Sequence, residues 1–243
     1  MRLFGLIGYP LTHSFSKKYF TEKFEKEGLN DCRYELFSIA SINDLKKVLD
    51  QHPGLEGLNV TIPYKEQVLP FLDEQDTVVK KIKACNCIVL KKGKLKGYNT
   101  DAEGFERSLK KHLQPHHKNA LILGTGGAAK AVEYVLQKLG IGYKYVSRKP
   151  SVNNYSYQQL TPPVIADHPL IINTTPLGMY PAINEAPPVP YELLTSRHYL
   201  FDLVYNPEKS LFLQKGGTRG AIIKNGYEML VIQAEESWRI WNS

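Results

Sequence analysis

One stretch limits the fold of this chain more than any other: an apolar run that leads through a glycine-rich turn into a helical pattern. The run Ala120–Leu123 has the length of a strand, and residues 130–136 have helical periodicity. Between them stands Gly124-Thr125-Gly126-Gly127-Ala128-Ala129, which matches G-x-G-x-x-A in strand–turn–helix context. The first glycine permits a tight turn, the second lets the backbone approach a pyrophosphate, and a small third residue allows close helix–strand packing.

The start of the following helix also favours phosphate, because free N–H groups gather there at the positive end of the helix dipole. We therefore expect a dinucleotide on this turn; a purely structural glycine turn is the alternative. The residues expected to bind it are Gly124, Thr125, Gly126, Gly127 and Ala128.

The next predicted strand ends in a basic turn, Ser147-Arg148-Lys149. Sites for NAD usually carry Asp or Glu at this place to bind the ribose 2′-hydroxyl. Two cations and no carboxylate favour a 2′-phosphate instead. We therefore predict NADP(H) rather than NAD(H), with a solvated basic turn as the alternative.

Strand and helix patterns alternate along the whole chain, which predicts mostly parallel sheets covered by helices. We expect two α/β domains with a cleft between them. The first is a substrate-binding domain over 1–101, completed by a C-terminal helix at 226–243. The second is a Rossmann-type NADP-binding domain over 102–225. Strands are predicted at 3–8, 32–39, 55–61, 86–91, 94–98, 119–123, 142–147, 169–174, 199–204 and 219–224, and helices at 16–28, 43–51, after Pro63, 75–83, 101–112, 127–139 and 226–241.

The composition narrows the possible partners. The 243 residues carry a net charge of +7, but the basic residues are dispersed, so we expect small anions and not nucleic acid. No apolar run reaches the ~20 residues of a membrane span, and the N-terminal run is too short for a signal peptide. From these two observations we expect a cytoplasmic protein. Three cysteines argue for reduced structural thiols and no metal site. The oligomeric state is left open between monomer and homodimer.

Lys65 and Asp101 are the candidate acid–base residues. Lys65 falls in the first turn of a helix after Pro63, where the helix dipole disfavours a cation. A cation in this unfavourable position, with no obvious compensating residue, suggests a functional role for Lys65. An exposed surface lysine is the simpler interpretation. Asp101 is expected at the first helical position, with Thr100 and Glu103 forming a capping box.

Several neutral polar residues accompany this pair. Asn59 and Thr61 share one face at the end of a predicted strand, where open α/β sheets bind ligands. Asn86 lies in a strand, where a polar side chain needs a partner. Ser14 and Ser16 precede a helix and could be simple N-caps. Together with a hydride cofactor, these groups suit carbonyl reduction on a polyhydroxylated substrate.

Ordered motifs along nearly the whole chain resemble the shikimate dehydrogenase family. They begin with residues 8–16, 59–65 (Asn-Val-Thr-Ile-Pro-Tyr-Lys) and 85–89, and continue with 97–105 and the glycine turn. Residues 173–179, 202–207 and 226–234 complete the set. The resemblance implies NADPH-dependent reduction of 3-dehydroshikimate to shikimate. The alternatives are a relative that uses quinate, or both acids, perhaps with NAD, and methylenetetrahydrofolate dehydrogenase, which should lack these motifs.

The resemblance also implies roles for individual residues. Lys65 would transfer the proton with Asp101 as its partner, and Asn59 would support the site. The family often has Asn-Arg-Thr where this chain has Ser147-Arg148-Lys149, so the phosphate contacts of this turn stay open. The substrate would be held by Ser14, Ser16, Thr61, Asn86, Tyr205 and Gln233, and the cofactor by the glycine turn, the basic turn, Thr174, Val204 and Gly226.

Overall fold

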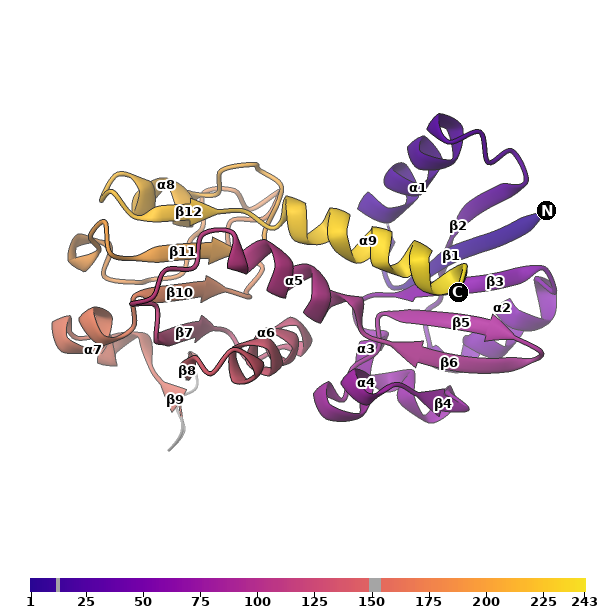
Figure 1. The fold of residues 1–243 in the computed structure, drawn as a ribbon, viewed down its shortest axis with the longest axis horizontal. Coiled ribbons are helices and arrows are strands. Elements are labelled where there is room, and N and C mark those ends of the chain that lie inside the picture. Colours follow the sequence, from indigo (N-terminus) through magenta and orange to yellow (C-terminus); the bar gives the residue numbers. More distant parts are fainter. Residues whose placement is uncertain (12–13, 149–153) are drawn as a thin grey trace. The chain divides into compact units, whose positions relative to one another are not determined.

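A computed structural model of the chain describes residues 1–11, 14–148 and 154–243. The chain divides into two compact units (Figure 1). Unit 1 consists of residues 1–103 and 233–243, and unit 2 consists of residues 104–232. Two helices, α5 (Thr100–Lys110) and α9 (Tyr227–Trp241), contribute residues to both units.

Unit 1 is built on a six-stranded mixed sheet in the order β2-β1-β3-β5-β6-β4. Three of its five strand pairings are parallel, as the prediction of a mostly parallel sheet requires, and β5 pairs antiparallel with both of its neighbours. The antiparallel pairing of β5 with β6 follows from the tight turn Lys92-Gly93, whose residues have φ of 51° and 74° and reverse the chain directly. The strands are β1 (Arg2–Gly8), β2 (Cys32–Ser38), β3 (Leu55–Val60), β4 (Glu74–Gln75), β5 (Cys87–Lys91) and β6 (Lys94–Tyr98).

Each face of this sheet has its own apolar core, because side chains alternate along the strands. Leu58, Val60 and Ile88 belong to one core. The other core is rich in aromatic rings and contains Phe4, Phe20, Phe24, Tyr34, Trp238 and Trp241. The helices that precede α5 are α1 (Phe15–Lys26), α2 (Leu45–Gln51), α3 (Tyr64–Gln67) and α4 (Thr77–Ile82).

Unit 2 contains a six-stranded sheet in the order β12-β11-β10-β7-β8-β9, and all of its pairings are parallel. Numbered from β7, this is the order 3-2-1-4-5-6 of a Rossmann-type sheet, as predicted. The strands are β7 (Asn119–Leu123), β8 (Gly142–Val146), β9 (Asn154–Tyr155), β10 (Leu170–Asn173), β11 (Tyr199–Asp202) and β12 (Ile222–Lys224). The helices are α6 (Gly127–Lys138), α7 (Pro162–Asp167) and α8 (Leu211–Gly217).

The predicted strands and longer helices are confirmed to within a few residues. The short elements α7, α8, β4 and β9 were not predicted. In the described part of the chain, no helix combines the length and the apolar character that a bilayer span requires. Among these residues, no group of three or more His, Cys, Asp or Glu side chains could hold a metal ion. Cys32, Cys85 and Cys87 are free thiols and all are buried.

Candidate active site

Lys65 and Asp101 form an ion pair in unit 1. The Lys65 Nζ lies 2.7 Å from the Asp101 Oδ2, and the two side chains are 22% and 13% exposed. They are therefore sheltered but still reachable from solvent. The pairing follows from the sheet: β3 and β6 are both antiparallel to β5, so they run in the same direction and end at the same edge. Lys65 follows the end of β3, and Asp101 follows the end of β6.

The start of α5 differs from the predicted capping box. The helix begins at Thr100, one residue earlier than expected, and the Asn99 Oδ1 caps it by accepting a hydrogen bond from the Ala102 N–H at 3.2 Å. The Thr100 hydroxyl does not cap the helix and is hydrogen-bonded to Asn86 instead. Asp101 therefore occupies the second helical position, still within the first turn, where the helix dipole stabilises a carboxylate.

Asn86 fixes this helix start. Its Oδ1 accepts a hydrogen bond from the Thr100 N–H at 2.7 Å, and its Nδ2 donates to the Thr100 Oγ1 at 3.0 Å. Gln233 on α9 joins them, since its Oε1 accepts from the Thr100 Oγ1 at 3.5 Å. The structure thus brings Asn86 and Gln233, both predicted site residues, to the residue that precedes Asp101.

Asn59 is only 4% exposed and its side chain is fully engaged with protein. Its Oδ1 accepts from the Tyr34 hydroxyl at 2.8 Å. Its Nδ2 donates to the Asn86 carbonyl at 3.3 Å and to the Ser237 Oγ at 3.0 Å. This geometry fits a residue that supports the site. Tyr34 and Ser237 were not predicted; the one available signal is that Ser237 stands one helical turn after Gln233.

Ser14 and Ser16 lie at the start of α1. Ser14 is the N-cap, and its Oγ accepts a hydrogen bond from the Lys17 N–H at 3.2 Å. That bond leaves the hydroxyl hydrogen of Ser14 available for another acceptor. No acidic residue stands in the first turn of α1, so its positive end suits an anion. Thr61 lies beside the end of β1, because its N–H donates to the Ile7 carbonyl at 2.9 Å.

The predicted cofactor residues of unit 2 follow neighbouring strands of its parallel sheet. The Gly124 N–H donates to the Val146 carbonyl at 2.9 Å, so the glycine turn adjoins the end of β8, where Ser147 and Arg148 follow. Lys149 lies outside the described residues. On the other side, the Thr174 Oγ1 donates to the Leu123 carbonyl at 2.7 Å.

The next strand on that side, β11, is followed by Val204 and Tyr205. Gly226, which follows β12, donates its N–H to the Val204 carbonyl at 3.2 Å. Tyr205 belongs to unit 2, and its role toward a substrate stays a prediction. The described members of the predicted cofactor set therefore lie along one edge of one sheet.

Gly124 and Gly126 differ in whether the fold itself requires a glycine at their position. Gly124 has φ of +102°, and a Cβ there would meet the Thr175 Cγ2 at 2.9 Å. The fold itself therefore requires glycine at this position. Gly126 has an ordinary φ of −78°, and no atom of the described chain lies within 4 Å of its Cβ position. Because no described residue beyond its chain neighbours occupies this space, the space fits a ligand that approaches the start of α6.

Asp202 is a buried carboxylate at the end of β11 that sequence reasoning did not assign to the site. Its Oδ1 accepts from the Asn173 Nδ2 at 2.9 Å and from the Val204 N–H at 3.0 Å, and its Oδ2 accepts from the Ser210 hydroxyl. Burial raises the pKa of Asp202 from its ordinary 3.8 to about 6, although these hydrogen bonds oppose the rise. Asp202 therefore organises the loop that carries Val204.

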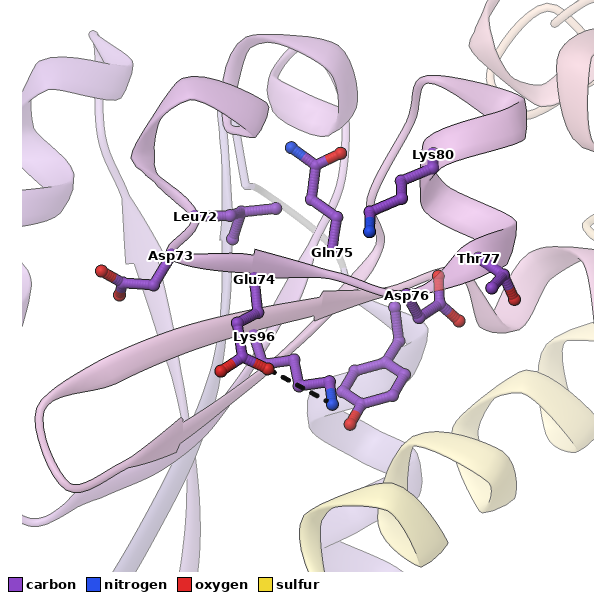
Figure 2. A pocket seen from close by; sticks show the side chains of 9 residues that line it. Leu72, Asp73, Glu74, Gln75, Asp76, Thr77, Lys80 and Lys96 are labelled. Atoms are coloured by element: carbon purple, nitrogen blue, oxygen red, sulfur yellow. Dashed lines mark ion pairs between the residues drawn. The ribbon is translucent and has the colours of Figure 1, made fainter.

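A separate groove of about 630 Å³ lies beside β4 and β6 in unit 1 (Figure 2). Several of its charged side chains have structural partners: Lys96 pairs with Glu74 at 3.5 Å, and the Asp76 Oδ1 accepts from the Val79 N–H at 2.6 Å to cap α4. None of the predicted site residues lines it. We assign this groove no part in the chemistry.

Comparison with known proteins gives one consistent answer. Residues 6–88 match the family model described as the shikimate dehydrogenase substrate binding domain. A protein of Carboxydothermus hydrogenoformans described as shikimate dehydrogenase (NADP(+)) is 38% identical over 261 residues, which cover 99% of this chain and 91% of the relative.

Two solved structures illustrate the likeness in three dimensions. The shikimate 5-dehydrogenase of Thermus thermophilus in complex with NADP(H) and shikimate has a TM-score of 0.87 and 29% identity, covering 99% of this chain and 93% of that one. The quinate dehydrogenase of Corynebacterium glutamicum in complex with NAD has a TM-score of 0.87 and 28% identity, with the same coverage. Because the Carboxydothermus relative is 38% identical over nearly the whole of both chains, the chain belongs to the shikimate dehydrogenase family.

Proposed function

We propose that this protein catalyses the reversible, NADPH-dependent reduction of 3-dehydroshikimate to shikimate. The observation that carries the proposal is the sheltered Lys65–Asp101 ion pair at the sheet edge of unit 1, in a chain of this family. The same unit holds Ser14, Ser16 and Asn86, whose hydroxyl and amide groups suit a polyhydroxylated acid.

The pair performs the proton transfer. In the reductive direction, Lys65 donates a proton to the substrate's carbonyl oxygen, which becomes a hydroxyl; in the oxidative direction, it accepts that proton. Asp101 orients the ammonium through the 2.7 Å contact. The reaction balances because the carbonyl carbon receives a hydride while its oxygen receives the proton. NADPH, when bound, supplies that hydride.

The anionic end of the substrate suits the start of α1. Ser14 and Ser16 stand there at the positive end of a twelve-residue helix. We assign Asn86, Gln233 and Thr61 to the hydroxyl groups and Asn59 to the support of these side chains. Tyr205, which belongs to unit 2, is assigned to the substrate by the resemblance alone. These assignments follow the resemblance and are proposals.

The cofactor residues fit a dinucleotide. The open space at Gly126 lets the backbone approach a pyrophosphate, and Gly127 begins α6, whose N–H groups favour phosphate. Arg148 provides a cation for the 2′-phosphate of NADP(H). The residues that would hold the cofactor are Gly124, Thr125, Gly126, Gly127, Ala128, Ser147, Arg148, Lys149, Thr174, Val204 and Gly226.

We also propose that residues 1–101 with 226–243 serve the substrate and residues 102–225 serve the cofactor. The boundaries between the two compact units differ slightly from these domain boundaries, because they fall after Glu103 and after Ile232. A cytoplasmic location is a further proposal, supported by the three free, buried thiols, which suit a reducing compartment.

The direct test is oxidation by the purified chain of shikimate or quinate with NADP+ or NAD+, followed by absorbance of the reduced cofactor. We expect the highest kcat/KM with shikimate and NADP+. Turnover of quinate with NAD+ at an equal or higher kcat/KM would replace the proposal with the quinate alternative. No turnover of either acid would reject it.

A further inference from the structure

The loops that follow β10 and β11 in unit 2 are joined by one buried pair of side chains. Asn173 ends β10, Asp202 ends β11, and the two residues are partners in the parallel pairing of these strands. The Asn173 Nδ2 donates to the Asp202 Oδ1 at 2.9 Å. Both residues are 0% exposed. A polar group buried to this degree is costly unless it is hydrogen-bonded, so its other partners show what the pair holds in place.

Asn173 holds the loop after β10. Its Oδ1 accepts from the Thr175 N–H at 3.0 Å and from the Thr175 hydroxyl at 2.7 Å. The neighbouring Thr174 donates its N–H and its hydroxyl to the Leu123 carbonyl, at 3.0 and 2.7 Å. A Cβ at Gly124 would lie 2.9 Å from the Thr175 Cγ2 and 3.0 Å from the Thr174 Oγ1. This loop is therefore fixed directly against the glycine turn.

Asp202 holds the loop after β11. Its Oδ1 accepts from the Val204 N–H at 3.0 Å, and the Val204 carbonyl accepts from the Gly226 N–H at 3.2 Å. A Cβ at Gly226 would lie 2.2 Å from the Leu203 carbonyl oxygen, so the two backbones are in close contact. The Leu203 N–H in turn donates to the Asn173 carbonyl at 3.0 Å. The backbone of Val204 is thus held at both its N–H and its carbonyl, and Asp202 supplies one of these two bonds.

These loops belong to one nucleotide-binding half of the sheet. A Rossmann-type sheet has two such halves, and a dinucleotide spans the point where the strand order reverses. In unit 2 that point lies between β7 and β10. Arg148, the proposed contact of the 2′-phosphate, follows β8, so the adenosine half of NADP(H) is assigned to the side of β7, β8 and β9. The nicotinamide half is then left for the loops that follow β10, β11 and β12.

We propose that Asn173 and Asp202 are positioning residues for the nicotinamide half of the cofactor. They act by holding the backbone of Thr174, Thr175 and Val204 in the arrangement that the nicotinamide meets. The inference rests on the proposed function, because it concerns the cofactor assigned there. Neither Asn173 nor Asp202 touches the cofactor in this account, since both side chains are buried and hydrogen-bonded to protein.

The test compares NADP+ with adenosine 2′,5′-bisphosphate, which contains the adenosine half and lacks the nicotinamide. Asp202→Ala removes the acceptor of the Val204 N–H, so this backbone must be ordered anew when the nicotinamide binds. Ordering the backbone of one residue corresponds to roughly five- to thirtyfold in affinity. We expect the calorimetric Kd for NADP+ to rise by that factor and the Kd for the bisphosphate to stay within about twofold. A variant that is only less stable binds fewer ligands per chain and keeps both Kd values.

Ser210→Ala is the matched control. Ser210 is also 0% exposed, and its hydroxyl donates to the Asp202 Oδ2, but it serves as the N-cap of α8. This variant loses a buried hydrogen bond to the same carboxylate and keeps the bonds from Asn173 and Val204. We therefore expect its Kd for NADP+ to equal that of the wild type. A rise as large as in Asp202→Ala would overturn the inference.

Asp202→Asn should restore binding. Its amide oxygen can still accept from Asn173 and Val204, because the reversed orientation would set amide hydrogens against two donors. We expect its Kd for NADP+ to lie within about threefold of the wild-type value. A Kd as high as that of Asp202→Ala would overturn the inference.

Asn173→Ala keeps the inference testable if Asp202→Ala does not fold. It frees Thr175 and leaves Asp202 the bonds from Val204 and Ser210, so the same selective rise in the Kd for NADP+ is expected. An unchanged Kd for NADP+ in a folded alanine variant, or an equal rise for both ligands, would overturn this inference alone. A wild type that does not bind NADP+ would overturn the proposed function, and the inference with it.

Discussion

Alanine substitutions at Gly124 and Gly126 should separate the fold of the glycine turn from its binding role. At Gly124, alanine must adopt a φ of +102°, and its Cβ would meet the Thr175 Cγ2 at 2.9 Å and the Thr174 Oγ1 at 3.0 Å. The strained backbone alone costs about 1–3 kcal/mol. We therefore expect Gly124→Ala to lower the free energy of unfolding by at least ~2 kcal/mol.

Gly126→Ala should have the opposite profile. Its backbone angles suit alanine and its Cβ position is open, so the free energy of unfolding should change by less than ~1 kcal/mol. The added methyl group would hold a pyrophosphate away from the N–H groups of α6. Losing one hydrogen bond to a charged group costs about 1.5–3 kcal/mol, which corresponds to a Kd for NADP+ about 10- to 150-fold higher.

Urea unfolding followed by circular dichroism measures the first quantity, and calorimetric titration with NADP+ measures the second. Both tryptophans lie in unit 1, so their fluorescence reports whether that unit is intact in either variant. Wild-type affinity for NADP+ in Gly126→Ala would refute the assignment of the turn. Wild-type stability in Gly124→Ala would refute the conformational argument.

Two further predictions concern unit 2. Arg148→Ser should lower the preference for NADP+ over NAD+, measured as a ratio of kcat/KM values, by roughly tenfold or more, because one charge-assisted phosphate contact is lost; an unchanged ratio would remove Arg148 from this role. Asp202 has a folded-state pKa raised above its unfolded value, so its protonation stabilises the fold below pH 3.8 and that stability is lost as pH rises through about 6. Asn at position 202 cannot ionise, so the Asp202→Asn variant does not lose this stability. Its free energy of unfolding, minus that of the wild type, should therefore increase by up to ~3 kcal/mol between pH 4 and pH 7. A difference between the two proteins that does not change with pH would contradict this.

Local patterns predicted the long elements and the glycine turn, because strand runs and helical periodicity depend on neighbouring residues. The helices α7 and α8 have six and seven residues, too few for periodicity to be distinctive. The start of α5 shows that the exact N-cap residue is also hard to predict from local sequence. Asn99 and Thr100 are both good N-cap residues, and the choice between them depends on Asn86, which is distant in the sequence and occupies the Thr100 hydroxyl.

Residues of the candidate site could be predicted from the sequence where they belong to a recognisable motif. Lys65 and Asp101 stand in separate motifs, and their pairing depends on the direction of strands that a sequence does not display. Tyr34 and Ser237 were missed for a related reason: each looks like an ordinary residue of an apolar element. Their importance arises from the hydrogen bonds to Asn59, which exist only once β2, β3 and α9 have packed together.

The central claim is that Lys65 and Asp101 act together in proton transfer, and kcat for shikimate oxidation in Lys65→Ala, Asp101→Asn and the double variant tests it most directly. General acid–base catalysis contributes about 10²–10⁴ to a rate. We expect Lys65→Ala to lower kcat by that factor with the Kd for NADP+ unchanged, and the double variant to lose little more. A kcat within about threefold of wild type in Lys65→Ala, or losses that multiply in the double variant, would contradict the account.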